Sequence, residues 1–236
     1  MSLRLPFLFL AALALSFGHT LATADPLVVS VSGKANIFGA GHAAAPDVEG
    51  HGGAGILPPV VSLPSQPGLA VTFGPVTGMA CCNAEPVCFG PDGGRFGSYT
   101  QTVISSYGGI SGILHGESVM FLVGVFINGQ EPTDPAPERL DFGHAGVTDR
   151  FAELSPVLNQ VFFIGDGNAN GLPQVFHVPT GATRLFLGFE DAWNFEGSPG
   201  YYDDNSGHLE ASVSIFPYLP TAGLVTSWGR VKALYR

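Results

Sequence analysis

The sequence predicts an all-β protein, built as a single antiparallel sandwich with long loops rich in glycine and proline. The 236-residue chain contains 33 Gly and 19 Pro, and only 12% of its residues are charged. Gly and Pro disfavour helices and separate short strands. Leu185, Leu187 and Phe189 occupy alternate positions of one apolar stretch, and apolar and polar side chains alternate along residues 209–215. This alternation is typical of strands buried on one face.

The first 24 residues have the pattern of a secretory signal. A basic residue, Arg4, precedes the apolar run 5–15, and the small residues of 22–24 form a cleavage site. The apolar run is too short for a membrane-spanning helix. We therefore expect a secreted chain that begins at Asp25 and has no membrane span.

The net charge of the chain is −10. Such an acidic protein is repelled by nucleic acid and by anionic membranes, so neither is expected as a partner. Neutral sugars and cations remain compatible with this charge.

The remaining strands are expected at intervals along one domain, residues 25–216. Residues 27–31 form the first strand, and 69–73 form a short one. Residues 42–68 between them indicate a long irregular loop. The run 118–127 is apolar at nearly every position, which favours a central strand buried on both faces. Residues 217–236 carry no clear strand pattern and form an irregular tail.

Residues 166–171 match the first half of an EF-hand calcium loop. Oxygen-bearing side chains occupy positions one, three and five, and Gly171 occupies position six. Position twelve is His177 instead of Glu, and both flanks indicate strands. A hairpin loop is therefore the better interpretation.

The three cysteines, Cys81, Cys82 and Cys88, lie in one short segment. In an oxidising compartment we expect a disulfide between Cys82 and Cys88, because the neighbours Cys81 and Cys82 are hard to bridge without strain. One thiol then remains. A zinc site is the alternative, but no nearby His completes a ligand set.

The loop 190–205 carries five carboxylates, and no Lys or Arg occurs from 185 through 229. Crowded carboxylates repel one another unless a cation lies among them. Asp, Asn and backbone carbonyl oxygens are the ligands that Ca²⁺ prefers. The alternative is a solvated acidic loop without a cation.

The run from Asp191 through the Pro-Gly turn to Asp204, Asn205 and the final strand resembles the calcium loop of the PA-I-type galactophilic lectins. Related domains also occur in secreted bacterial proteins with PEP-CTERM sorting tails. The resemblance implies a jelly-roll, galactose-binding-like sandwich. It also implies a Ca²⁺ site formed by the side chains of Asp191, Asp204 and Asn205 and the backbone carbonyls of Tyr201 and Phe38.

This chain departs from the lectin pattern at three places. Asp204 stands where that family has the first Asn of an Asn-Asn pair. The loop after Asp191 is about six residues longer than in the lectins. Gly90-Pro91-Asp92-Gly93 replaces a His-Pro-Asp-Gln run that contacts sugar in that family.

The expected function is calcium-dependent binding of extracellular carbohydrate, with no enzymatic activity. Aromatic rings of the loop offer apolar faces for a sugar ring to stack on. A structural matrix or envelope protein, in which calcium only rigidifies the loop, is the alternative, and a secreted hydrolase is the third hypothesis. The expected sugar contacts are Asp92, Asp191, Trp193, Tyr201 and Asp204.

Overall fold

The computed structural model describes residues 25–218 except 49, 51, 84–86 and 144–147. The expected signal segment and most of the expected tail lie outside the described residues. The described part contains strands and short 3-10 helices and no α-helix. The all-β prediction is therefore confirmed.

The largest sheet is organised around two long antiparallel strands, β3 (Leu69–Cys82) and β16 (Ser206–Pro217). Their pairing runs from Ser206 opposite Cys81 to Pro217 opposite Leu69, with a bulge between Ala211 and Val213. This bulge lets β3 continue past Gly74-Pro75, although the sequence predicted that the strand would end at residue 73. The order across this first sheet is β1 (Leu27–Ser32), β16, β3, β13 (Val175–His177) and β9 (Glu153–Leu154), and β4 (Val87–Phe89) pairs with the far end of β3.

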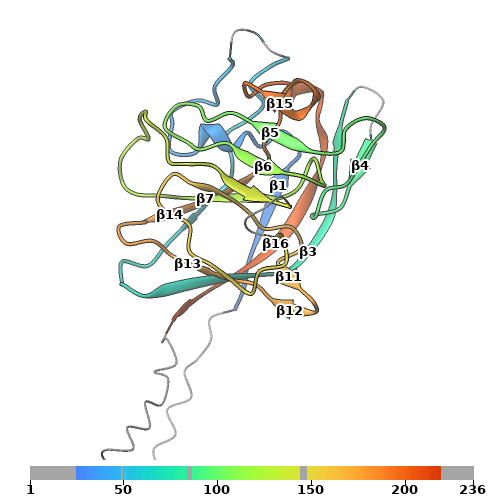
Figure 1. Ribbon diagram of the computed structural model, residues 1–236. Coiled ribbons are helices and arrows are strands. Elements are labelled where there is room, and N and C mark those ends of the chain that lie inside the picture. Colours follow the sequence, from blue (N-terminus) through green and yellow to red (C-terminus); the bar gives the residue numbers. More distant parts are fainter. Residues whose placement is uncertain (1–24, 49, 51, 84–86, 144–147, 219–236) are drawn as a thin grey trace, which may run out of the picture.

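A second and a third sheet complete the body of the domain (Figure 1). The order across the second sheet is β10 (Val161–Phe163), β7 (Val123–Ile127), β14 (Arg184–Gly188) and β2 (Val60–Ser62). The order across the third is β15 (Glu196–Gly197), β5 (Thr102–Ile104), β6 (Ile113–His115) and β8 (Leu140–Phe142). The segment 42–68 is thus not wholly irregular, because β2 lies within it and pairs with β14.

The expectation of purely antiparallel pairing is wrong. Three pairs are parallel, namely β13 with β9, β15 with β5, and β6 with β8. Parallel neighbours need a crossover connection. Between β6 and β8 the chain makes that crossover by passing through β7 of the second sheet.

Two hydrophobic cores lie on opposite faces of the second sheet. In β7, Phe126 belongs to a core shared with the first sheet, where it joins side chains such as Phe73 and Leu209. Its neighbours Val125 and Ile127 belong to the other core. That second core is shared with the third sheet through residues that include Ile104, Ile113 and Phe142.

The sheets are therefore layered, with the second sheet between the other two. All five residues of β7 are buried. This confirms the prediction of a central strand buried on both faces, although β7 is shorter than the predicted 118–127.

The EF-hand-like segment forms a hairpin, as the sequence favoured. Its strands β11 (Asn168–Ala169) and β12 (Leu172–Pro173) are antiparallel. Asn170 and Gly171 make the turn with φ of 55° and 80°. Such left-handed pairs are typical of two-residue hairpin turns.

The disulfide joins Cys81 to Cys88, so the predicted Cys82–Cys88 pairing is wrong. Cys81 and Cys88 are direct partners across β3 and β4, and their Cα atoms are 3.9 Å apart. Cys82 faces the other side of the strand, because successive side chains alternate. It is buried and free.

We expect non-reducing peptide mapping to show Cys81 linked to Cys88. The Cys82 thiol should resist alkylation in the folded protein and react after denaturation, because only 3% of the residue is exposed. Burial, reinforced by Asp191 and Asp204, raises its pKa to about 12. A Cys82–Cys88 peptide, or rapid alkylation of Cys82 in the native state, would contradict this assignment.

Candidate functional site

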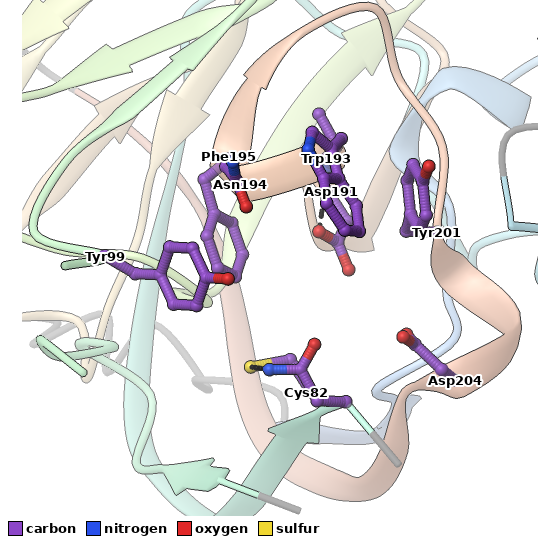
Figure 2. Close-up of a pocket in the computed structure, with 10 residues that line it drawn as sticks. Cys82, Tyr99, Asp191, Trp193, Asn194, Phe195, Tyr201 and Asp204 are labelled. Carbon is purple, nitrogen blue, oxygen red and sulfur yellow. Dashed lines mark hydrogen bonds between the residues drawn. The ribbon is translucent and has the colours of Figure 1, made fainter. Parts of the chain in front are cut away.

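The loop that follows β14 encloses a small pocket against the end of β3 (Figure 2). The cavity has a volume of about 40 Å³. It combines acidic, aromatic and thiol side chains from three parts of the chain. The lining residues are Cys82, Asn83, Tyr99, Asp191, Ala192, Trp193, Asn194, Phe195, Tyr201 and Asp204.

Short-range backbone bonds give the loop its shape. Ala192 and Pro199 form a bridge, and the Gly200 amide donates to the Asp191 carbonyl at 3.0 Å. Two 3-10 helices, η2 (Trp193–Phe195) and η3 (Tyr202–Asp204), lie within the loop. These contacts bring Asp191 and Asp204 to the same pocket although thirteen positions separate them.

Asp191 is the most constrained acid of the pocket. Only 3% of it is exposed, and its two oxygens accept hydrogen bonds from the Ala192 amide and the Asn205 side chain, both at 2.7 Å. Burial raises the pKa of Asp191 well above the ordinary value, and the two hydrogen bonds partly oppose that rise. Asn205 is also buried, and its Oδ1 has no hydrogen-bond partner among the described residues.

Tyr202 fixes the backbone behind this pair. The fully buried side chain accepts a hydrogen bond from the Asp191 amide at 3.1 Å and donates one to the Phe189 carbonyl at 3.2 Å. The hydroxyl therefore joins the end of β14 to η3. It holds the acidic end of the loop against the core.

Asp204 lies nearer the solvent, and burial also raises its pKa, though less strongly. Lys34, which follows β1, lowers it in part. The Lys34 ammonium donates to the Asp203 carbonyl at 2.6 Å, and the Asp203 side chain accepts from the Gly55 amide at 3.2 Å. A cation that is distant in sequence thus approaches the loop, although the loop itself carries none.

Two aromatic pairs form the remaining walls. Trp193 and Tyr201 have ring centroids 5.1 Å apart, and Tyr99 and Phe195 have centroids 5.8 Å apart in an edge-to-face arrangement. Figure 2 shows the two pairs on different sides of the opening, with the Asp191 and Asp204 carboxylates directed toward it. Trp193 is 62% exposed, so it presents a ring face to solvent.

The structure gathers most of the predicted site residues. Asp191, Trp193, Tyr201 and Asp204 line the pocket, and Asn205 is bonded to Asp191. Glu196 of the same loop is outside the pocket lining, and its carboxylate accepts a hydrogen bond from Gln101.

Phe38 does not line this pocket, so its assignment as a calcium ligand is not supported. It lies in 3-10 helix η1 (Ile37–Gly39), is fully buried in the second core and lines a different cavity with His42. The Asn36 side chain accepts a hydrogen bond from the Phe38 amide at 3.0 Å. Local packing of η1 therefore determines where this residue lies.

Asp92 does not line the pocket either, so the pocket gives no support to its predicted sugar contact. Its Oδ1 accepts a hydrogen bond from the Asp166 amide at 2.7 Å. Its neighbour Pro91 accepts from the Leu122 amide at 2.9 Å. The 90–94 turn is therefore tied to the loop before the β11–β12 hairpin.

Outside the 190–205 loop, sequence reasoning missed three lining residues, Cys82, Asn83 and Tyr99. Alternation along β3 turns Cys82 away from the disulfide-bonded Cys81, but this signal was lost because the predicted strand ended at residue 73. No local pattern placed Tyr99 beside a loop almost a hundred residues further along the chain.

The donor set suits a hard cation more than a transition metal. Within the described residues, no three His, Cys, Asp or Glu side chains gather into a metal-binding group. Asp191 and Asp204 instead line one pocket, the Asn205 side chain is bonded to Asp191, and oxygen donors of this kind suit Ca²⁺.

Comparison with known proteins identifies no relative, because no protein-family model, curated protein or solved structure matches the chain. In the part of the chain that the structure describes, no helix is long and apolar enough to cross a membrane. Hypotheses about function therefore depend on the pocket itself.

Proposed function

We propose that this is a secreted, calcium-dependent carbohydrate-binding protein with a galactose-binding-like sandwich at its centre. The observation that carries the proposal is the pocket of the 190–205 loop, where two carboxylates meet an exposed aromatic ring. Acidic oxygens provide a cation site, and the ring provides a surface for a sugar. The two features lie on the same opening.

Asp191, Asp204 and the Oδ1 atom of Asn205 would hold the calcium ion, together with the Tyr201 carbonyl. Ca²⁺ would supply positive charge that offsets the cost of burying Asp191 and could accept sugar hydroxyls as further ligands. The hydrogen bonds from Ala192 and Asn205 keep the Asp191 carboxylate in place. The Tyr202 hydroxyl accepts a hydrogen bond from the Asp191 amide and so holds the backbone at Asp191 in place.

Trp193 and Tyr201 would contact the apolar face of a sugar ring. Aromatic rings bury much area, and their flat faces suit the C–H surface of a pyranose. The two rings pack against each other at a tilt, with their centroids 5.1 Å apart. A neutral sugar would therefore find a preformed surface beside the acidic pocket.

Calcium should stabilise the folded protein against heat, because only the folded state brings the oxygens together. At a hundredfold excess over its dissociation constant, a ligand of this kind contributes about 2.7 kcal/mol. Asp204→Ala should abolish the calcium-dependent rise in melting temperature. Glu196→Ala should retain it, because Glu196 lies on the same loop but does not line the pocket. Calorimetry that finds equal calcium binding by wild type and Asp204→Ala would refute the site.

A glycan array in calcium and in chelator separates carbohydrate binding from the structural alternative. Signals that vanish with chelator and with Trp193→Ala support the proposal. Calcium-dependent stabilisation without any glycan signal would favour a structural matrix or envelope protein.

A further inference from the structure

The walls of the pocket have the two features that attract an organic cation. Aromatic faces carry a negative electrostatic potential, and four aromatic residues, Tyr99, Trp193, Phe195 and Tyr201, line the cavity. Two carboxylates, Asp191 and Asp204, point toward the same opening (Figure 2). Each feature favours positive charge independently of the other.

The described lining contains no Lys, Arg or His to neutralise the two acids. The ammonium of Lys34 lies near the loop, but it donates to the Asp203 carbonyl at 2.6 Å, and Lys34 does not line the cavity. The described lining therefore offers two carboxyl groups and no basic side chain, and a bound cation would favour their ionised form.

The size of the cavity limits what can enter it. A volume of about 40 Å³ accommodates roughly three water-sized groups. That is enough for a primary ammonium group and too little for a pyranose ring. The bulk of a larger ligand must stay at the mouth, where Trp193 is 62% exposed.

We propose that the pocket recognises amino sugars, with the ammonium group of a hexosamine beside Asp191 and Asp204 and its ring stacked on Trp193. This inference rests on the carbohydrate-binding part of the proposed function and is independent of its calcium part. Calcium and the ammonium group would contact the same two carboxylates. They therefore compete for the pocket.

The test compares glucosamine with N-acetylglucosamine and glucose by titration calorimetry at neutral pH in the presence of chelator. Acetylation removes the positive charge, and glucose has a hydroxyl in place of the amine. Glucosamine should bind about tenfold more tightly than either, because only it brings a cation to the acids and the rings. Added calcium should weaken glucosamine binding. Equal affinities for the three sugars, or no binding of glucosamine, would overturn the inference.

Matched variants assign the effect to the pocket. Asp204→Asn should lower glucosamine affinity about tenfold, and Trp193→Ala should lower it by a similar factor, because each removes one of the two contacts. Both residues are exposed, so the variants should fold. Glu196→Gln removes a loop charge outside the pocket and should leave the affinity unchanged. Tetramethylammonium bound more tightly than glucosamine would show a simple cation site and contradict the sugar assignment.

The outcomes keep the two proposals apart. Neutral sugars that bind only with calcium, without any preference for glucosamine, would leave the proposed function standing and remove this inference. If wild type binds glucosamine in chelator and calcium has no effect on any neutral sugar, the amino-sugar inference stands and the proposed calcium-dependent function falls.

Discussion

Phe162→Ala should lower the free energy of unfolding by about 3–5 kcal/mol, which is the cost of removing a buried aromatic side chain. Phe162 is fully buried, and its ring centroid is 5.1 Å from the centroids of both Phe126 and Phe176. Phe126 belongs to the second sheet and Phe176 to the first. The substitution therefore opens a cavity at the contact between two layers, where neither sheet can collapse easily.

The residue opposite Phe162 adds to this cost. Gly124 of β7 pairs with Phe162, and a Cβ atom at Gly124 would lie 2.8 Å from the Phe162 ring. The ring thus fills space that the glycine leaves empty, and alanine at 162 would leave both positions without packing atoms.

Denaturant unfolding of both Phe162→Ala and Leu172→Ala provides the measurement. Leu172 is 70% exposed on β12, so its truncation should change stability by no more than about 0.5 kcal/mol. Equal losses in the two variants would show that Phe162 is not at the centre of the core.

The sequence predicted the features of the fold that depend on local alternation. The apolar run around β7 and the alternation of 209–215 determine which residues face a core, and both strands are present. The layering of three sheets was not predictable in this way. It depends on β5, β6 and β8, which are each three residues long, and on the parallel pairing of β6 with β8 through a crossover that leaves no local pattern.

The candidate site shows the same division between local and distant information. Asp191, Tyr201 and Asp204 lie on one loop, and the crowded carboxylates of that loop together with its resemblance to the lectin calcium loop were sufficient to group them. Phe38 and Asp92 were placed by resemblance alone, and the packing of η1 and the bond to Asp166 put them elsewhere. The disulfide was mispredicted because the register of β3 against β4 selects Cys81.

Because of Glu190, the free energy of unfolding should fall as the pH rises above the ordinary pKa range of a carboxyl group. The residue is 3% exposed, and neither carboxylate oxygen has a well-formed hydrogen bond among the described residues, although the Ile113 backbone lies close enough to act on it. Burial raises the pKa of Glu190 well above its usual value, and the Ile113 amide and Arg139 only partly oppose this. The folded protein therefore keeps a proton on Glu190 that the unfolded chain releases.

The sign of the pH dependence follows from that difference in bound protons. Below the unfolded pKa, about 4.3 for a Glu side chain, both states hold the proton and Glu190 contributes no slope. Between this value and the raised folded pKa, only the folded state holds it. The free energy of unfolding then falls by about 1.4 kcal/mol for each pH unit that the solution becomes more basic. Above the folded pKa the slope disappears again.

Glu190→Gln should remove this slope, because the amide has the size of the protonated acid and does not titrate. Denaturant unfolding across pH, in chelator, should show wild type and Glu190→Gln with similar stability in acid and the variant increasingly more stable toward neutral pH. Glu196→Gln, at a solvent-exposed position of the same loop, should follow the wild-type curve. Buried Asp191 retains its own contribution in both proteins, so the informative quantity is the difference between their slopes. Parallel curves for wild type and Glu190→Gln would mean that Glu190 is already ionised in the folded state, and that a cation or an ordered water satisfies its oxygens.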